Sequence, residues 1–186
     1  MAASPPVLWT PPPDARERSR MGRFMTEIER THGLSLAGYD DLLRWSIEAP
    51  DAFWGSVWTH FGLGDDPGTV LIDDSMPGAR WFPDARLNWA EWCLRLEGRG
   101  ADDIAIISRS QTRERTTLTV AQLRDAVARA QGGLARLGIG RGDRVAAYLP
   151  NVPEAVIGVL ACASLGAIWT SCAPEFGIRS VIDRFG

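Results

Sequence analysis

The sequence predicts an α/β protein in which a helical N-terminal segment precedes the first crossover units of a mostly parallel sheet. Apolar residues recur at helical spacing in the first half of the chain, and short apolar runs alternate with helical patterns after about residue 102. Strand, helix and strand in succession with short connections are typical of a parallel sheet. We therefore expect a flexible lead over residues 1–13, a helical, Trp-rich segment over 14–98 and the start of an α/β domain over 99–186.

Helical patterns fill the N-terminal segment. Asp14 and Glu17 have the spacing of a capping box, and Gly33 suits the end of the helix behind them. Further helices are predicted from Asp40, from Asp51 and behind a capping Asn88. The residues that these three helices should bury are, in order, Leu42, Leu43 and Ile47; Phe53, Trp54, Val57, Trp58 and Phe61; and Trp89, Cys93 and Leu96.

Tryptophan is concentrated at the front of the chain. Seven of the eight tryptophans precede residue 93, which invites a ligand-stacking interpretation. They fall on predicted helix faces, however, where aromatic side chains supply a large buried area to a thin helical layer. We therefore interpret them as core residues.

The second half of the chain alternates strands and helices. A polar turn, SRSQTRE, joins its first two strands and predicts a hairpin, and Thr119 with Gln122 forms a second capping box. The expected elements are strands over residues 104–107 and 115–118, a helix from Thr119 to Gly138, a buried strand over 144–149, a helix to about Leu165 that Asn151 caps and that has Pro153 in its first turn, and a strand over 167–172.

The basic residues exclude several kinds of catalytic site. All 20 are arginine, and the chain contains no lysine. A Walker-type phosphate loop and a lysine Schiff base both require lysine, so the chain forms neither. The formal net charge is −3, which gives no general attraction to nucleic acid or to an anionic membrane. We therefore expect the chain to bind neither nucleic acid nor a membrane.

The cysteines and histidines predict no metal site and no catalytic residue. Cys93, Cys162 and Cys172 are odd in number, form no CxxC motif and have no histidine at ligand spacing. This usage favours a reducing, cytoplasmic compartment. No acidic residue near His32 or His60 in the sequence is placed to orient either ring for catalysis.

Two glycine-rich features have structural interpretations. Residues 155–174 carry no charge over about the length that spans a bilayer, but Gly166 divides them into a helix pattern and a strand pattern. We therefore expect two elements of a globular domain rather than a membrane span. Gly138, Gly140 and Gly142 follow a helix and precede a strand, the reverse of a dinucleotide-binding loop, and so serve a turn.

Two stretches carry a resemblance to a known family. LARLGIGRGDRVAAYLPNVPEAVIGVLACASLGAIWTSCAPEF resembles the first crossover of the AMP-forming acyl-CoA synthetases, an adenylate-forming superfamily. PGARWFPDARLNWAEWCLR is similar to the N-terminal segment of the acetyl-CoA synthetase branch. Within that branch, SCAPEFGIRSVIDRFG resembles the acetoacetate–CoA ligases, because acetyl-CoA synthetases usually have Gly-Gly-Phe where this chain has Pro174-Glu175-Phe176.

The resemblance implies an AMP-forming acid–thiol ligase and an incomplete copy of its fold. Such an enzyme activates acetoacetate with ATP and Mg²⁺ to an acyl-adenylate and then transfers the acyl group to CoA. The phosphate loop, adenine site and catalytic lysine of the family have no counterpart in this chain, which is expected to be inactive without the remainder of the polypeptide. In relatives, the neighbourhood of Ser171, Cys172, Pro174 and Glu175 lines the tunnel for CoA.

Two alternatives remain open at this point. The chain could be a non-catalytic binding or interaction protein derived from such a ligase, or part of a ligase of the acetyl- or propionyl-CoA synthetase type. A downstream reading frame that encodes the phosphate loop and lysine would favour the enzyme. Plain loop structure is the alternative role for the four residues of the expected tunnel, since fold-level resemblance alone does not establish a site.

Overall fold

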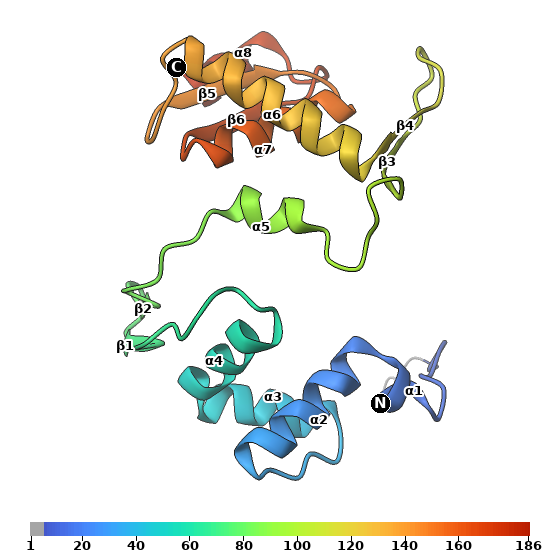
Figure 1. Cartoon of the computed structure of the whole chain (residues 1–186), viewed down its shortest axis with the longest axis vertical. Coiled ribbons are helices and arrows are strands. Elements are labelled where there is room, and N and C mark those ends of the chain that lie inside the picture. The colour runs from blue at the N-terminus through green and yellow to red at the C-terminus, as the bar shows by residue number, and fades with distance from the viewer. Residues whose placement is uncertain (1–5) are drawn as a thin grey trace, which may run out of the picture. The chain divides into compact units, whose positions relative to one another are not determined.

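The computed structural model describes residues 6–186, which form two compact units that divide after Arg86 (Figure 1). The first five residues of the expected lead lie outside the described part of the chain. The elements of the first unit are α1 (Ala15–Arg18), α2 (Arg20–His32), α3 (Tyr39–Glu48), α4 (Pro50–His60), β1 (Leu71–Asp73) and β2 (Arg80–Trp81). Those of the second unit are α5 (Trp89–Arg95), β3 (Ile104–Ser108), β4 (Thr116–Thr119), α6 (Val120–Arg136), β5 (Arg144–Tyr148), α7 (Pro153–Ser164), β6 (Ile168–Cys172) and α8 (Ile178–Phe185).

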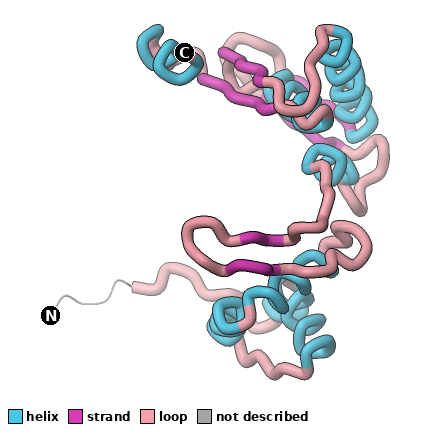
Figure 2. The backbone as a smooth tube through the Cα atoms, turned by 90° about the vertical axis from the view of Figure 1, so that its left-hand side faces the viewer, coloured by secondary structure: helices cyan, strands magenta, loops and turns pink. Residues whose placement is uncertain are grey.

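The first unit is a small helical layer beside a short antiparallel pair, β1 and β2 (Figure 2). Its core is formed by one face of α2 and by residues that follow it in sequence. The buried members of this core are Phe24, Met25, Ile28, Leu36 and Leu42. The side chains of Trp45, Phe53 and Val57 pack against it and are partly buried.

The predicted capping box at Asp14 is wrong, because helix α1 ends at Arg18 and the next helix, α2, begins with Ser19 as its own N-cap. The Ser19 hydroxyl accepts the amide hydrogen of Gly22 at 2.9 Å, whereas the Asp14 side chain caps nothing and pairs with Arg18 on the surface. The fold requires Gly22 to be a glycine, since a Cβ there would lie 1.6 Å from the carbonyl oxygen of Arg16. Gly33 ends α2 in the left-handed conformation, as predicted.

The helices α3 and α4 bury less than their apolar patterns predict. Leu42 of α3 is buried, but Leu43 and Ile47 are 44% and 70% exposed. In α4, Trp58 is the buried residue, and Trp54 and Phe61 are about half exposed. A helix in a two-layer unit presents only one narrow face to the core, so the flanking apolar positions stay at the surface.

The second unit contains the predicted hairpin and the predicted parallel pair. Strands β3 and β4 are antiparallel, and Thr119 and Gln122 form the capping box that opens α6. Strands β5 and β6 are parallel, with Arg144 opposite Ile168 at one end and Tyr148 opposite Cys172 at the other. The connection between β5 and β6 contains α7, as a crossover unit requires. The α/β fold class is therefore confirmed.

The core of the second unit lies where α5, α6 and α7 meet. Its buried residues are Ala90, Leu123, Val127, Leu160 and Ala161. Asn88 caps α5 as predicted, because its side-chain oxygen accepts the amide hydrogen of Glu91 at 3.1 Å.

Three local expectations in this unit are wrong. Trp89 is 59% exposed, because it lies on the outer face of α5. Val152 rather than Asn151 is the N-cap of α7 and makes no side-chain cap, although Pro153 occupies the first turn as predicted. Strand β5 is not continuously buried: exposed and half-buried residues alternate along it, and Arg144, Ala146 and Tyr148 lie on its more exposed face.

The uncharged stretch 155–174 is divided between α7 and β6, with Gly166 in the left-handed conformation between them. Among residues 6–186, no helix combines the length and the apolar character that crossing a bilayer requires.

Candidate functional site

The four residues of the expected tunnel lie together at the carboxyl end of β6. Ser171 and Cys172 are the last residues of the strand, and Pro174 and Glu175 occupy the turn that follows it. Ser171, Pro174 and Glu175 are exposed, whereas Cys172 is only 3% exposed. Ligands of open α/β sheets bind beyond the carboxyl ends of the strands, so this edge is a candidate site by position.

The turn after β6 has a defined geometry. The amide hydrogen of Phe176 is donated to the carbonyl oxygen of Ala173 at 3.1 Å, which closes a four-residue turn with Pro174 in its second position. Proline suits that position because its ring fixes φ near the value that the turn needs. One residue before the turn, the carbonyl oxygen of Cys172 accepts the amide hydrogen of Leu149 at 3.1 Å and extends the pairing of β5 with β6.

Sequence reasoning missed the residues that hold this turn. The Tyr148 hydroxyl lies 2.6 Å from the carbonyl oxygen of Pro174 and 2.9 Å from that of Phe176. From α8, the guanidinium carbon of Arg184 lies 5.0 Å from the centre of the Phe176 ring. A tyrosine directly after the apolar run Val145–Ala147 was the one available signal, because its hydroxyl favours a polar partner.

None of the three thiols is arranged for nucleophilic chemistry. Cys172 is buried, and none of the ion pairs in the described residues places a histidine near it. Burial raises the pKa of the Cys93 and Cys162 thiols above the usual range, which disfavours the reactive thiolate. In residues 6–186 no three His, Cys, Asp or Glu side chains are grouped to hold a metal ion.

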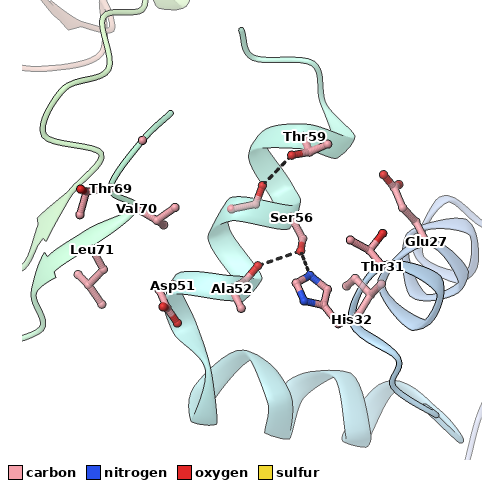
Figure 3. Close-up of a pocket in the computed structure, with 13 residues that line it drawn as sticks. Glu27, Thr31, His32, Asp51, Ala52, Ser56, Thr59, Thr69, Val70 and Leu71 are labelled. Carbon is pink, nitrogen blue, oxygen red and sulfur yellow. Dashed lines mark hydrogen bonds between the residues drawn. The ribbon is translucent and has the colours of Figure 1, made fainter. Parts of the chain in front are cut away.

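A second candidate is a cavity of about 510 Å³ in the first unit, lined by residues of α2, α4 and the segment that leads into β1 (Figure 3). His32 faces Ser56 there, with 2.8 Å between Nε2 and the hydroxyl oxygen. The same hydroxyl lies 2.8 Å from the carbonyl oxygen of Ala52, so its single hydrogen has two acceptors within reach. The contact links the last residue of α2 to α4.

His60 has an acidic partner that its sequence neighbourhood did not reveal. The Nδ1 atom of His60 lies 2.6 Å from a carboxylate oxygen of Glu27, which is 33 positions earlier in the chain. The His60 ring also packs edge-on against Phe24, with 4.9 Å between the ring centres. The pair joins α2 to α4 beside the core, which is a structural role.

The chain matches two family models over residues 39–93 and 95–184. Residues 39–93 match the acetyl-coenzyme A synthetase N-terminus, and residues 95–184 match the AMP-binding enzyme family. Acetoacetyl-coenzyme A synthetase from Rhizobium meliloti is 45% identical over 96% of this chain, and acetoacetyl-CoA synthetase from Macaca fascicularis is 38% identical over the same share. The solved acetoacetyl-CoA synthetase from Streptomyces lividans matches 97% of this chain with 43% identity and a TM-score of 0.91.

The chain is homologous to the N-terminal part of the acetoacetyl-CoA synthetases. These homologues are named as acetoacetyl-CoA synthetases, and the family model for the second unit is that of AMP-binding enzymes, in agreement with the resemblance. The chain spans 27% of the length of the two curated synthetases and 28% of the solved one. The AMP-binding match includes β5, β6 and the turn after β6, so the candidate edge lies inside the part of the chain that this family shares.

Proposed function

We propose that this chain is the N-terminal part of a ligase that activates acetoacetate with ATP and transfers the acyl group to CoA. In the first half-reaction, a carboxylate oxygen attacks the α-phosphorus of ATP and pyrophosphate leaves. In the second, the CoA thiol attacks the acyl carbon of the adenylate and AMP leaves. The observation that supports this proposal is the 45% identity to an acetoacetyl-CoA synthetase over nearly the whole chain.

We assign the edge formed by Ser171, Cys172, Pro174 and Glu175 to the binding of CoA. It lies beyond the carboxyl ends of β5 and β6, where ligands of such sheets gather. Ser171 and the Pro174 ring are exposed and uncharged, which suits the uncharged, amide-bearing arm of CoA. Cys172 contributes through its backbone and its packing, because its side chain is buried.

The ATP-dependent step needs groups that this chain does not carry. Stabilising the charge on a transferred phosphoryl or adenylyl group is largely the work of cations, and Mg²⁺ bound to ATP supplies part of that charge. The chain has no lysine to place against the phosphates of ATP, and its described residues form no cluster of three or more metal-ligating side chains. We therefore propose that ATP and Mg²⁺ bind the remainder of the polypeptide and that the 186-residue chain alone is inactive.

The acyl substrate is the least constrained part of the proposal. A malonamoyl-CoA synthetase from Penicillium aethiopicum is 36% identical over 96% of this chain. Relatives named for different acyl groups therefore share this region. The acetoacetate assignment therefore rests on the higher identity, 45%, to the Rhizobium meliloti acetoacetyl-coenzyme A synthetase. We place the enzyme in the cytoplasm, because all three cysteines are free in the structure.

A chimaera tests the proposal directly. In it, this chain replaces the matched N-terminal segment of the Streptomyces lividans acetoacetyl-CoA synthetase, whose fold it shares with a TM-score of 0.91. ATP–pyrophosphate exchange reports the first half-reaction, and CoA-dependent release of AMP reports the second. We expect both half-reactions with acetoacetate, and weaker ATP–pyrophosphate exchange with acetate, propionate or malonamate.

The isolated chain should give the rate of the blank in both assays. A folded chimaera without exchange would contradict the ligase and favour a non-catalytic binding protein.

A further inference from the structure

We infer that Tyr148 is a positioning residue for the CoA-binding edge. Its hydroxyl fastens the turn after β6 to the end of β5, through the carbonyl oxygens of Pro174 and Phe176. This inference rests on the proposed function, because it assigns the turn to CoA. Tyr148 itself need not touch the ligand: it acts by setting where the turn stands relative to the sheet.

The shape of the turn and its placement have different causes. Its shape is local, since Pro174 restricts φ and the amide hydrogen of Phe176 bonds to the carbonyl oxygen of Ala173. Neither feature connects the turn to β5. Tyr148 does, because it is the last residue of β5 and stands opposite Cys172 in the parallel ladder. Its side chain thus reaches from one strand end to the segment that leaves the other.

The Tyr148 hydroxyl contacts the turn at two points, which favours a fixed turn. A phenol has one hydrogen, so the hydroxyl shares it between two carbonyl oxygens at 2.6 and 2.9 Å. Both oxygens belong to the same turn and point to one atom, which opposes a rotation of the turn about the strand axis. With these oxygens directed at Tyr148, the side chains of Pro174 and Glu175 remain exposed at the rim.

The turn has a second link, from the opposite direction. The guanidinium group of Arg184, in α8, lies over the ring of Phe176. This contact is between two exposed residues, where water and salt weaken it. Tyr148 is itself 53% exposed, so the two links differ in their contacts rather than in burial: the hydroxyl reaches two backbone oxygens of the turn, and its loss should loosen the turn more than loss of the Arg184 guanidinium.

The test uses Tyr148→Phe in the chimaera, with Tyr39→Phe as the matched control. These are the two tyrosines of the chain, and Tyr39 lies in α3 of the other unit. A net hydrogen bond in a protein corresponds to about a two- to tenfold change in an equilibrium. We expect the KM for CoA to rise by about that factor in Tyr148→Phe. The rate of ATP–pyrophosphate exchange and the kcat at saturating CoA should stay unchanged, and Tyr39→Phe should match the parent chimaera.

Arg184→Gln serves as a second variant and should raise the KM for CoA by less than Tyr148→Phe does. An unchanged KM for CoA in Tyr148→Phe would overturn the inference while leaving the ligase intact. So would an equal rise in the KM values for acetoacetate and ATP, because that pattern signals general loosening.

A parent chimaera with no ATP–pyrophosphate exchange would instead contradict the proposed function. Amide hydrogen exchange then still tests the contact itself. In Tyr148→Phe, residues 173–177 should exchange faster than in the parent, with β5 and β6 unchanged. Equal rates of amide hydrogen exchange over residues 173–177 in Tyr148→Phe and in the parent would refute a positioning role for Tyr148.

Discussion

The side-chain nitrogen of Asn88 lies 3.1 Å from the carbonyl oxygen of Ala163, a residue 75 positions later in the chain. The same nitrogen lies 3.1 Å from the carbonyl oxygen of Ser164. Because the side-chain oxygen of Asn88 also caps α5, a single amide joins the start of α5 to the last turn of α7. Those two carbonyl groups are among the four that have no partner within the helix at its end, although the Ala163 oxygen also accepts the amide hydrogen of Gly166 at 3.0 Å.

Two substitutions separate these roles of Asn88. Asn88→Ser keeps a capping oxygen but loses the amide donor, and Asn88→Ala loses both. We expect Asn88→Ala to lower the free energy of unfolding of the second unit by about 2 kcal/mol, and Asn88→Ser by about half as much. Urea unfolding of the chimaera, followed by hydrogen exchange in α5 and α7, measures both. An Asn88→Ser variant as stable as the parent would show that the amide donor contributes nothing, and equal losses in the two variants would show the same of the capping oxygen.

Trp58 and Trp54 lie on one helix and provide a matched comparison of buried and exposed aromatic residues. Trp58 is 6% exposed, its ring stacks on Phe82 with 5.1 Å between centres, and its indole nitrogen donates to the carbonyl oxygen of Asp65 at 2.9 Å. Trp58→Ala should therefore cost about 3–5 kcal/mol of stability in the first unit. Trp54→Ala, at a site that is 44% exposed, should cost far less. Chemical denaturation detects the difference, and similar costs would refute the assigned packing.

Gly22 should not tolerate a side chain. A Cβ there would lie 1.6 Å from the backbone oxygen of Arg16, and a backbone atom cannot turn aside as a flexible side chain can. Gly22→Ala should destabilise the first unit by about 1–3 kcal/mol or more, as overpacking does. Gly38→Ala is the control, because no atom lies within 4 Å of its Cβ position. A thermal melt of each variant measures the change, and a Gly22→Ala protein as stable as Gly38→Ala would disprove the close approach of α1 to α2.

Glu29 should make the first unit sensitive to acid. The amide hydrogen of Leu36, first, and the guanidinium of Arg16, second, lower the pKa of the Glu29 carboxyl below its usual range. A lowered pKa in the folded state adds stability above the unfolded-state value of about 4.3, and this stability is lost as the pH falls through the folded-state value. The structure places the two bonds at 2.8 Å to Leu36 and 2.7 Å to Arg16.

Glu29→Gln removes this titration. At pH 7 the variant should be less stable than the parent, and the difference should shrink as the pH is lowered below about 4. Glu48→Gln, at an exposed position in α3, is the control for a change of net charge. Urea midpoints at several pH values, followed by tryptophan fluorescence, give the comparison. A gap between parent and Glu29→Gln that does not depend on pH would contradict the assignment.

Much of the local structure follows from short-range patterns. Thr119 with Gln122 opens α6, Asn88 opens α5 and Gly33 ends α2, because a cap is satisfied by backbone groups within a few residues of it. The parallel pairing of β5 with β6 also follows, since two apolar runs joined by a helix have few other ways to pair. The candidate edge was predicted at Ser171, Cys172, Pro174 and Glu175 through resemblance, and its assignment to CoA stays a prediction.

Tertiary contacts decided the remaining features. Asp14 had the right spacing for a cap, but the close passage of Arg16 over Gly22 moved the start of the long helix to Ser19. Burial of Trp58 and exposure of Trp89 depend on which face of each helix meets a neighbour, and the sequence pattern does not identify that neighbour. The same holds for the pair His60–Glu27 and for the Tyr148 hydroxyl beside Pro174. Such contacts join residues 26 to 33 positions apart, so they exist only once the chain has folded and brought both partners to the same place.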